Sequence, residues 1–337
     1  MPLWSIDMDI YKYEISDILK ELPDLEPLNI EMPSDLFLCT VGFEDRTHSI
    51  IDEYCQTDFA PNSQFLFIKY PTNKKDNDRN LPFFQKAGKK MAGMDDILYS
   101  RGSYTQKLKT KLQSLISKCS FRVIFDISTC SSYVFYPTLS ELMKYDIDLT
   151  IVYSEADTYF PIKDEWENVN KKAKEENSFF IESFENAKFQ STGVDDLYAY
   201  SPFSEFNSGN KPSLLVAVPN FSAKRMNAIV HIDRELNKTP YGNIIWLIGE
   251  PPAEKNKWRI DAIKRTNNIV QAQTHFVSTL KHKEMILELE DIWSNSKYDY
   301  HMTIGSLGSK MQHLGTFCIF HAKPVSDSTG KRIRIPQ

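Results

Sequence analysis

The order of apolar segments constrains the fold of this chain more than any other feature. Apolar runs of strand length alternate with segments of helical spacing, and the whole series occurs twice. Strands that alternate with helices in this way are typical of a parallel sheet covered by helices on both faces. We therefore predict an α/β fold built from two tandem Rossmann-like parallel-sheet domains that form an internal pseudo-repeat.

The two series run in the same order. The first predicts strands at 36–41, 64–70, 97–100, 121–127 and 148–153, with helices at 47–54, 81–91, 105–118 and 133–143. The second predicts strands at 213–218, 243–248, 271–276 and 298–304, with helices at 222–236, 258–266, 281–293 and from 311 onward. Three landmarks recur at nearly constant offsets of 178, 180 and 177 residues, namely Phe43 with Phe221, Pro71 with Pro251, and Ser132 with Ser309. A shared register of this kind indicates a repeat.

The repeat sets the expected domain organisation. We predict an N-terminal helical leader at 1–35, a Rossmann-like domain A at 36–165, a connector at 166–212 and a Rossmann-like domain B at 213–337. The leader has apolar residues at helical spacing, such as Ile15, Leu19 and Leu22. The connector combines a charged helix at 166–176 with a stretch rich in Ser, Gly, Asn and Pro, which is typical of a surface segment between domains.

Length and cysteine usage exclude several classes of protein. A chain of 337 residues suits two domains of average size. Its start lacks the basic and apolar regions of a signal peptide, and its densest apolar run, Ile244–Ile248, is too short to cross a bilayer. The five cysteines are scattered and show no zinc spacing, so we expect neither a disulfide framework nor a metal site. We expect a cytoplasmic protein.

The charge is small overall but unevenly distributed. The net charge is −5, yet residues 69–122 hold thirteen Lys/Arg against four Asp/Glu, and residues 141–196 hold fourteen Asp/Glu against six Lys/Arg. Such asymmetry predicts an anionic partner or a protein partner for the basic 69–122 region. The alternative is two solvated faces that attract each other or another subunit. Sequence-specific DNA binding is not expected of so acidic a chain.

Cations follow the opening strand of each half. Arg46 and Arg225 both fall in or near the first turn of the next predicted helix. The helix dipole disfavours a cation there, so a bound anion would explain both positions. Ligands of open parallel sheets bind at this edge, outside the carboxyl ends of the strands. The alternative for Arg46 is a local ion pair with Glu44 or Asp45.

Small and hydroxyl residues follow the fourth strand of each half. These loops, 126–132 and 305–310, let backbone N–H groups approach a phosphate ahead of a helix. Neither loop matches a P-loop or the GxGxxG pattern, and Ser or Gly can also serve as an ordinary helix cap. The residues that we predict to bind the ligand are Thr40, Gly42, Arg46, Asp126, Ser128, Thr129, Ser132, Arg225, Gly305, Ser306, Gly308, Ser309 and Lys310.

Catalytic residues and a cofactor cannot be assigned from these motifs. Glu44, Asp45 and Asp126 are the loop carboxylates that an enzyme on this scaffold would use, and Cys130 is a candidate nucleophile. No third group that would orient a catalytic base is evident.

Thr40-Val41-Gly42-Phe43 followed by Arg46 resembles the first-strand loop of the CRISPR-associated Rossmann-fold sensor domains, and Asp126-Ile127-Ser128-Thr129 is similar to their Asp-x-Thr-Gly type motif. The resemblance covers residues 36–160, and Ser128 and Cys130 depart from the expected threonine and glycine. It implies that two such domains pair around a cyclic oligonucleotide or related nucleotide. It also implies that Thr40, Gly42, Arg46, Asp126, Ser128 and Thr129 contact that ligand.

The leading hypothesis is therefore a nucleotide-binding or nucleotide-sensing protein of prokaryotic antiviral defence, with its phosphorylated ligand in a cleft between the two halves. A second hypothesis is a hydrolase that cleaves a nucleotide or an N-glycosidic bond on the same scaffold. A third is a non-catalytic subunit of a multiprotein defence complex.

Overall fold

The computed structural model of the protein describes residues 19–20, 22–71, 74–116, 120–175, 211–236, 243–269, 273–322 and 333–334. The chain divides into two compact units, one formed by Met1–Ser154 with Val325–Gln337 and the other by Glu155–Pro324. Most of the predicted leader and most of the predicted connector lie outside the described residues.

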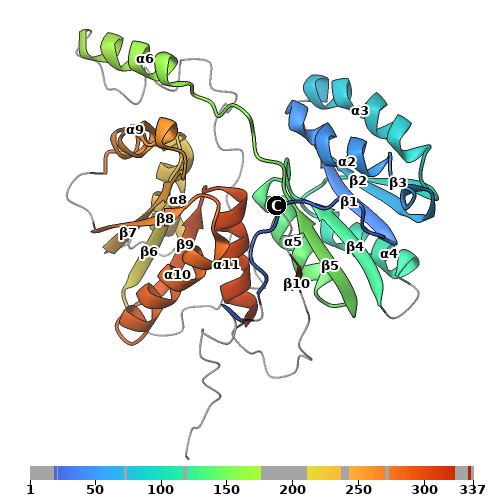
Figure 1. The fold of residues 1–337 in the computed structure, drawn as a ribbon. Helices are drawn as coiled ribbons and strands as arrows, with labels where there is room; N and C mark the ends of the chain where they lie inside the picture. Colours follow the sequence, from blue (N-terminus) through green and yellow to red (C-terminus); the bar gives the residue numbers. More distant parts are fainter. Residues whose placement is uncertain are drawn as a thin grey trace, which may run out of the picture. The chain divides into compact units, whose positions relative to one another are not determined.

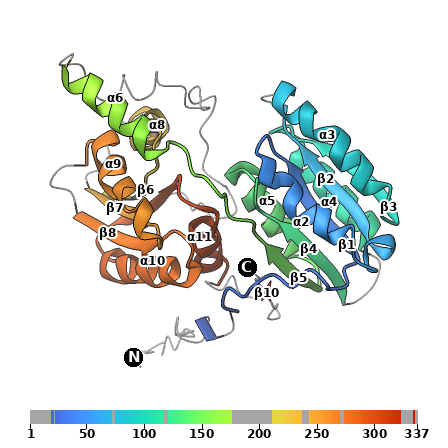
Figure 2. The ribbon, with the colours of Figure 1, turned by 45° about the horizontal axis from the view of Figure 1, so that its top comes forward.

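The first unit is a parallel sheet between two layers of helices (Figures 1 and 2). Its strand order is β10-β5-β4-β1-β2-β3. The strands are β1 (Leu36–Val41), β2 (Gln64–Lys69), β3 (Gly93–Leu98), β4 (Phe121–Asp126), β5 (Ile147–Val152) and β10 (Ile333–Arg334). The helical segments are η1 (Asp45–His48), α2 (Ser49–Tyr54), η2 (Ala60–Asn62), α3 (Lys74–Gly88), α4 (Tyr104–Leu115) and α5 (Ser132–Leu142).

The second unit repeats this arrangement. Its parallel sheet has the order β8-β7-β6-β9, from strands β6 (Ser213–Val218), β7 (Asn243–Glu250), β8 (Gln273–Ser278) and β9 (His301–Ser306). Its helical segments are α6 (Lys163–Glu175), α8 (Ala223–Leu236), η4 (Glu254–Asn256), α9 (Trp258–Thr266), α10 (His282–Ser296) and α11 (Lys310–Ala322). The first four strands of each unit lie in the order third, second, first, fourth, so the predicted pair of Rossmann-like parallel sheets is confirmed.

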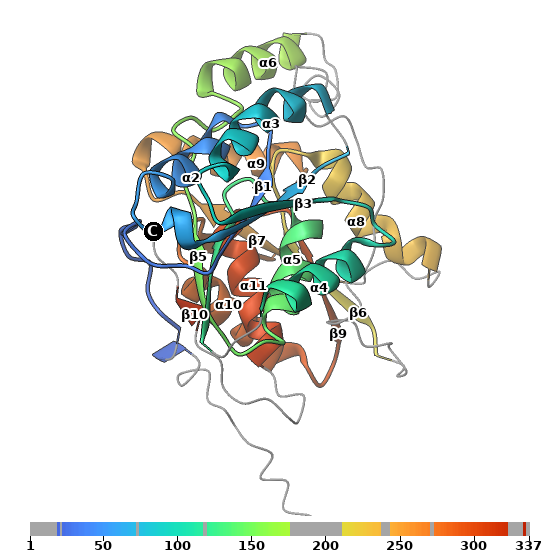
Figure 3. The same ribbon diagram turned by 90° about the vertical axis from the view of Figure 1, so that its right-hand side faces the viewer.

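Burial of β1 on both faces explains its unbroken apolar run. Phe37, Cys39 and Val41 point to one face of the sheet, where they pack with Ile51 of α2 and Phe84 of α3. Helices α4 and α5 cover the other face (Figure 3). All six residues of β1 are buried, as a strand in the middle of a doubly covered sheet requires.

Several element boundaries differ from the prediction. α3 begins at Lys74 rather than 81, and β3 begins at Gly93 rather than 97. β3 lies at the end of the sheet, where its carboxylates Asp95 and Asp96 pair with Lys111 and Lys69. Charged residues are common on such edge strands. Here they interrupt the apolar pattern from which the start of β3 was predicted. β9 runs on through Ser306, so two residues of the predicted 305–310 loop belong to a strand.

The strand pairing also crosses the predicted domain ranges. β10 pairs with β5, which places residues 333–334 in the sheet of the first unit rather than in a domain spanning 213–337. The division between the units falls after Ser154, earlier than residue 165. A two-residue strand carries no periodic pattern, so the sequence holds no signal for this pairing.

Candidate functional site

The strand order reverses between β1 and β4, which makes this edge the topological switch point of the first unit. Ligands of open α/β sheets bind at such points, because the loops after the two strands diverge there. The loops in question, 42–48 after β1 and 127–131 after β4, contain most of the predicted ligand residues of this half.

A cluster of threonines joins the two loops. The Thr129 hydroxyl lies 3.0 Å from the Thr40 hydroxyl and 3.2 Å from the Thr47 hydroxyl, and both Thr47 and Thr129 donate to the Thr40 carbonyl. The Gly42 N–H donates to the Thr47 hydroxyl (3.2 Å). A side chain at Gly42 would overlap Thr129, because an added Cβ would lie 2.5 Å from the Thr129 Cβ. Gly42 is therefore required by the close approach of the two loops.

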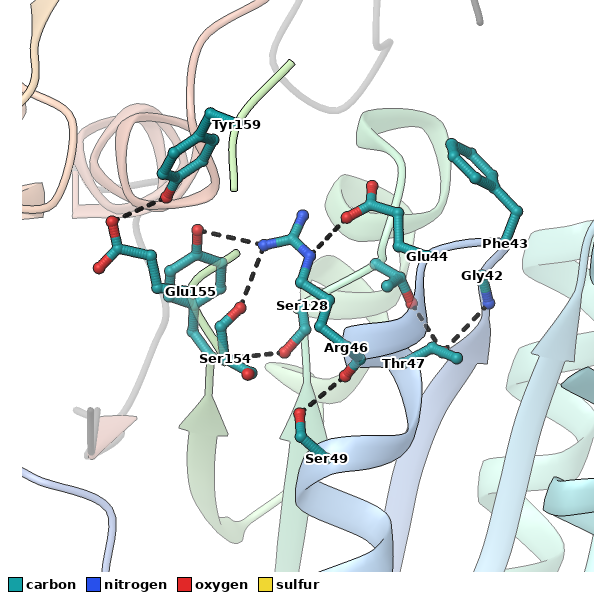
Figure 4. Close-up of polar contacts among 12 residues, drawn as sticks. Gly42, Phe43, Glu44, Arg46, Thr47, Ser49, Ser128, Ser154, Glu155 and Tyr159 are labelled. Carbon is teal, nitrogen blue, oxygen red and sulfur yellow. Dashed lines mark hydrogen bonds and ion pairs between the residues drawn. The ribbon is translucent and has the colours of Figure 1, made fainter. Parts of the chain in front are cut away.

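A second chain of hydrogen bonds runs from Asp126 to Arg46. The Asp126 carboxylate accepts from the N–H (2.8 Å) and the hydroxyl (2.5 Å) of Ser128, and the Ser128 hydroxyl accepts from the Ser154 N–H (2.7 Å). The Ser154 carbonyl in turn accepts from Arg46 Nη1 (3.1 Å). Figure 4 shows the part of this chain from Ser128 through Ser154 to Arg46. The structure thus links Arg46, Asp126 and Ser128, three of the residues predicted to contact a ligand, through hydrogen bonds.

Arg46 is the most buried cation of the switch point, with a side chain 16% exposed. Its Nε donates to Glu44 (2.5 Å), its Nη1 also donates to the Tyr153 hydroxyl (3.4 Å), and the guanidinium lies over the Tyr153 ring. Burial alone would lower the pKa of Arg46, but the Glu44 carboxylate and the Tyr153 hydroxyl together raise it above its ordinary value. The local pairing with Glu44 that the sequence left open is present, whereas Asp45 pairs with Arg79.

The first turn of α5 faces the same edge. Its preceding residue, Ser131, donates its N–H to the buried Tyr70 hydroxyl (2.8 Å). The next two N–H groups, of Ser132 and Tyr133, have no acceptor in the described part of the chain, as is normal for the start of a helix. Such N–H groups and the helix dipole favour an anion.

The buried Asp126 carboxyl has an unusual affinity for protons. Burial raises its pKa to about 6, although the two Ser128 hydrogen bonds and Arg46 lower it. Because the folded pKa exceeds the ordinary 3.8, the folded state holds this proton more tightly than the unfolded chain does. The resulting stabilisation is complete below pH 3.8 and is lost as the pH rises through about 6.

Asp126→Asn should remove this pH dependence. We expect wild-type stability, relative to the variant, to fall by about 1 kcal/mol between about pH 5 and pH 7. Urea unfolding of both proteins at the two pH values measures the difference. The exposed Asp58→Asn serves as the control and should track the wild type. Equal pH dependence in wild type and Asp126→Asn would contradict the expectation.

Structural contacts account for three of the corresponding residues of the second unit, Gly305, Gly308 and Ser309. Ser309 caps α11, because its hydroxyl accepts from Gln312 N–H while its own N–H donates to the Gln312 side chain. Added Cβ atoms at Gly305 and Gly308 would lie 2.4 Å from Ile229 Cγ2 and 2.3 Å from Gln312 Oε1, respectively. Packing therefore accounts for both glycines. Ser306 ends β9, Lys310 begins α11 and Arg225 lies in the first turn of α8.

Several residues at the site escaped the sequence reasoning. Thr47, Tyr153 and Ser154 all contact predicted ligand residues, and the Asn80 side chain donates to the Gly42 carbonyl (2.7 Å). Tyr153 and Ser154 directly follow β5, and position at a strand end is the one signal that could have drawn attention to them. The candidate nucleophile Cys130 is fully buried. Among the described residues no group of His, Cys, Asp and Glu could hold a metal ion, and none of the helices there is both long and apolar enough to cross a membrane.

No protein-family model matches the chain, and no curated protein does. A solved structure described as AtPrR2 in apo form is 10% identical over 89% of this chain and 93% of that chain, with a TM-score of 0.26. CalG4, the calicheamicin glycosyltransferase, is 10% identical over 86% of this chain and 94% of that chain, with a TM-score of 0.24. Similarity this low identifies neither a shared activity nor a shared ligand.

Proposed function

We propose that the first unit binds an anionic nucleotide at the β1/β4 switch point, in a protein of the prokaryotic antiviral-defence type. The observation that carries the proposal is the coincidence of Arg46 with the open first turn of α5 at this one edge. Arg46 supplies the charge, and the N–H groups of Ser132 and Tyr133 supply further donors for phosphate.

The ion pair between Arg46 and Glu44 leaves Arg46 able to bind a ligand. Arg46 Nη2 has no hydrogen-bond partner among the described residues, and the Glu44 side chain is 39% exposed. A phosphate can therefore approach Nη2 directly or displace the Glu44 carboxylate into solvent. Arginine suits this role because its planar group binds two oxygens at once.

The motifs after β1 and β4 favour a nucleotide over other anions. The stretch from Thr40 to Gly42 with Arg46, and the stretch from Asp126 to Thr129, resemble the CRISPR-associated Rossmann-fold sensor domains. The resemblance supports a cyclic oligonucleotide as the ligand and defence as the pathway. The predicted location in a cleft between the halves stays a prediction, as does a protein partner for the basic 69–122 region.

Isothermal titration with mono-, di- and cyclic oligonucleotides tests the proposal. At least one should bind the wild type, and Arg46→Lys should weaken it by about tenfold, since lysine keeps the charge but loses the two-point contact. Glu44→Gln should strengthen binding, because it removes the competing carboxylate.

The matched control is Arg122→Lys. Arg122 also pairs with a carboxylate, that of Asp35, but at the opposite end of β4. Its substitution should leave binding unchanged. The proposal fails if none of the nucleotides binds, or if Arg122→Lys weakens binding as much as Arg46→Lys does.

A further inference from the structure

A second cation lies at the carboxyl edge of the other sheet, in the second unit. Arg259 is the second residue of α9, which follows β7 through η4. At the far end of α9, the Asn267 side chain donates to the carbonyl of Asn220, just after β6 (2.7 Å). Helix α9 is thus tied to the segments that leave the carboxyl ends of β6 and β7.

The Arg259 guanidinium is held by neutral groups. Its Nη1 donates to the carbonyls of Tyr159 (3.4 Å) and Pro161 (2.8 Å), and its Nη2 donates to that of Phe160 (3.0 Å). Aromatic rings cover its faces, with the guanidinium carbon 4.4 Å from the ring centre of Phe221, 5.3 Å from that of Trp258 and 5.8 Å from that of Tyr159. The carbonyls and rings orient the cation but do not neutralise it.

No carboxylate pairs with Arg259 in the part of the chain that the structure describes. In this respect it differs from Arg46 and Arg122, which pair with Glu44 and Asp35. Burial lowers the pKa of Arg259 to about 10. A cation removed from water is costly unless an anion compensates it, and its place in the first turn of α9 adds an unfavourable helix dipole. Among the residues that the structure describes, no carboxylate supplies this compensation.

The unused donors of Arg259 are arranged for an oxyanion. Its Nη1 bonds two carbonyls and its Nη2 bonds one, whereas its neighbouring Nε makes no hydrogen bond among the described residues. Nε–H and one Nη2–H are therefore unused. Two adjacent N–H groups of arginine match two oxygens of a phosphate or carboxylate. The Nη2 contact with Phe160 is exposed, so a ligand can reach Nη2.

We propose that Arg259 anchors a second anion site, in the second unit, that binds the phosphate or carboxylate group of a ligand through Nε and Nη2. This site is separate from the one proposed at Arg46 and does not depend on it. The three carbonyls and the neighbouring rings hold the guanidinium, so it is already oriented before the ligand arrives.

NMR of the Nε–H groups tests the site in the full-length protein. The arginine is labelled with nitrogen-15, and the cross-peak absent from the Arg259→Lys spectrum is assigned to Arg259. Titration with inorganic phosphate, and separately with acetate, should shift this peak in a saturable way. The two titrations show which oxyanion the site prefers. We expect Arg259→Lys to weaken phosphate binding at this site by about tenfold, measured by calorimetry.

If Arg259→Lys folds poorly, the Arg259 peak can be assigned with Phe221→Leu and Trp258→Phe instead. Each of these substitutions changes a ring next to the guanidinium and should therefore shift the Arg259 peak. The phosphate and acetate titrations are then carried out on the wild-type protein. Chloride at matched ionic strength is the control for screening. No saturable shift with phosphate or acetate, or an equal shift with chloride, would overturn the proposal. A shift of the Arg46 peak alone would support the first site and overturn this one.

Discussion

Gly42→Ala is expected to destabilise the first unit by about 2–3 kcal/mol. The added Cβ would lie 2.5 Å from Thr129 Cβ and 2.8 Å from its hydroxyl. The Thr129 Cβ is attached directly to the backbone, so rotating a flexible side chain cannot relieve the contact. The loops after β1 and β4 must separate, which also breaks the hydrogen bonds of Thr129 with Thr40 and Thr47. Urea unfolding measures the loss.

Gly102→Ala is the matched control. Gly102 lies in the turn before α4, and an added Cβ there would meet nothing within 4 Å. The free energy of unfolding of the Gly102→Ala protein should differ from that of the wild type by less than about 1 kcal/mol. If Gly42→Ala is as stable as Gly102→Ala, the two loops are not in the close contact described, and the switch point would have to be wider than the structure shows.

The same substitution should also affect ligand binding if the proposed site is correct. Gly42 and Arg46 belong to one loop, and moving this loop away from Thr129 displaces Arg46 from its contacts with Tyr153 and Ser154. Weaker nucleotide binding by a folded Gly42→Ala protein would therefore support the site. This effect is separable from stability because titration can be carried out well below the unfolding temperature.

The fold could be predicted because each signal was local. The run Leu36–Val41 is apolar throughout, as a strand covered on both faces must be. The recurrence of this pattern at Ser213–Val218 predicted a second sheet, and the shared strand order confirms it. The loops of the switch point then followed from where parallel strands end.

The contacts within the site could be predicted only in part. Sequence spacing placed Glu44 two residues from Arg46, so their pairing was foreseeable. The other partners of Arg46, Tyr153 and Ser154, are more than one hundred residues away in sequence, with separations of 107 and 108. They become neighbours only through the pairing of β4 with β5, which a periodic pattern does not encode.

Ser309 illustrates a different limit. A small or hydroxyl residue before a helix fits both a phosphate loop and a helix cap, and the sequence Ser309-Lys310-Met311-Gln312 also fits a capping box. The hydrogen bonds show the cap. Arg259 was missed for the opposite reason, because neither its surrounding rings nor its carbonyl partners form a motif along the chain.

Acid should destabilise the second unit through His313. This residue of α11 is 5% exposed, and burial together with Lys310 lowers its pKa to about 3, from an ordinary value of 6.5. As the pH falls through about 6.5, the imidazole therefore binds a proton in the unfolded chain but stays neutral in the folded protein. The stabilisation is complete above that pH and is lost as the pH falls. Between about pH 7 and pH 5 we expect a loss of about 2 kcal/mol.

His313→Gln should remove most of this loss, because glutamine does not titrate. The exposed His231→Gln provides the control and should keep the wild-type dependence on pH. Urea unfolding at the two pH values compares the three proteins, and NMR of the His313 ring should show it still neutral at pH 5. Protonation of the ring near pH 6.5 in the folded protein would contradict the prediction, because a buried imidazolium beside Lys310 would then have to be tolerated without cost.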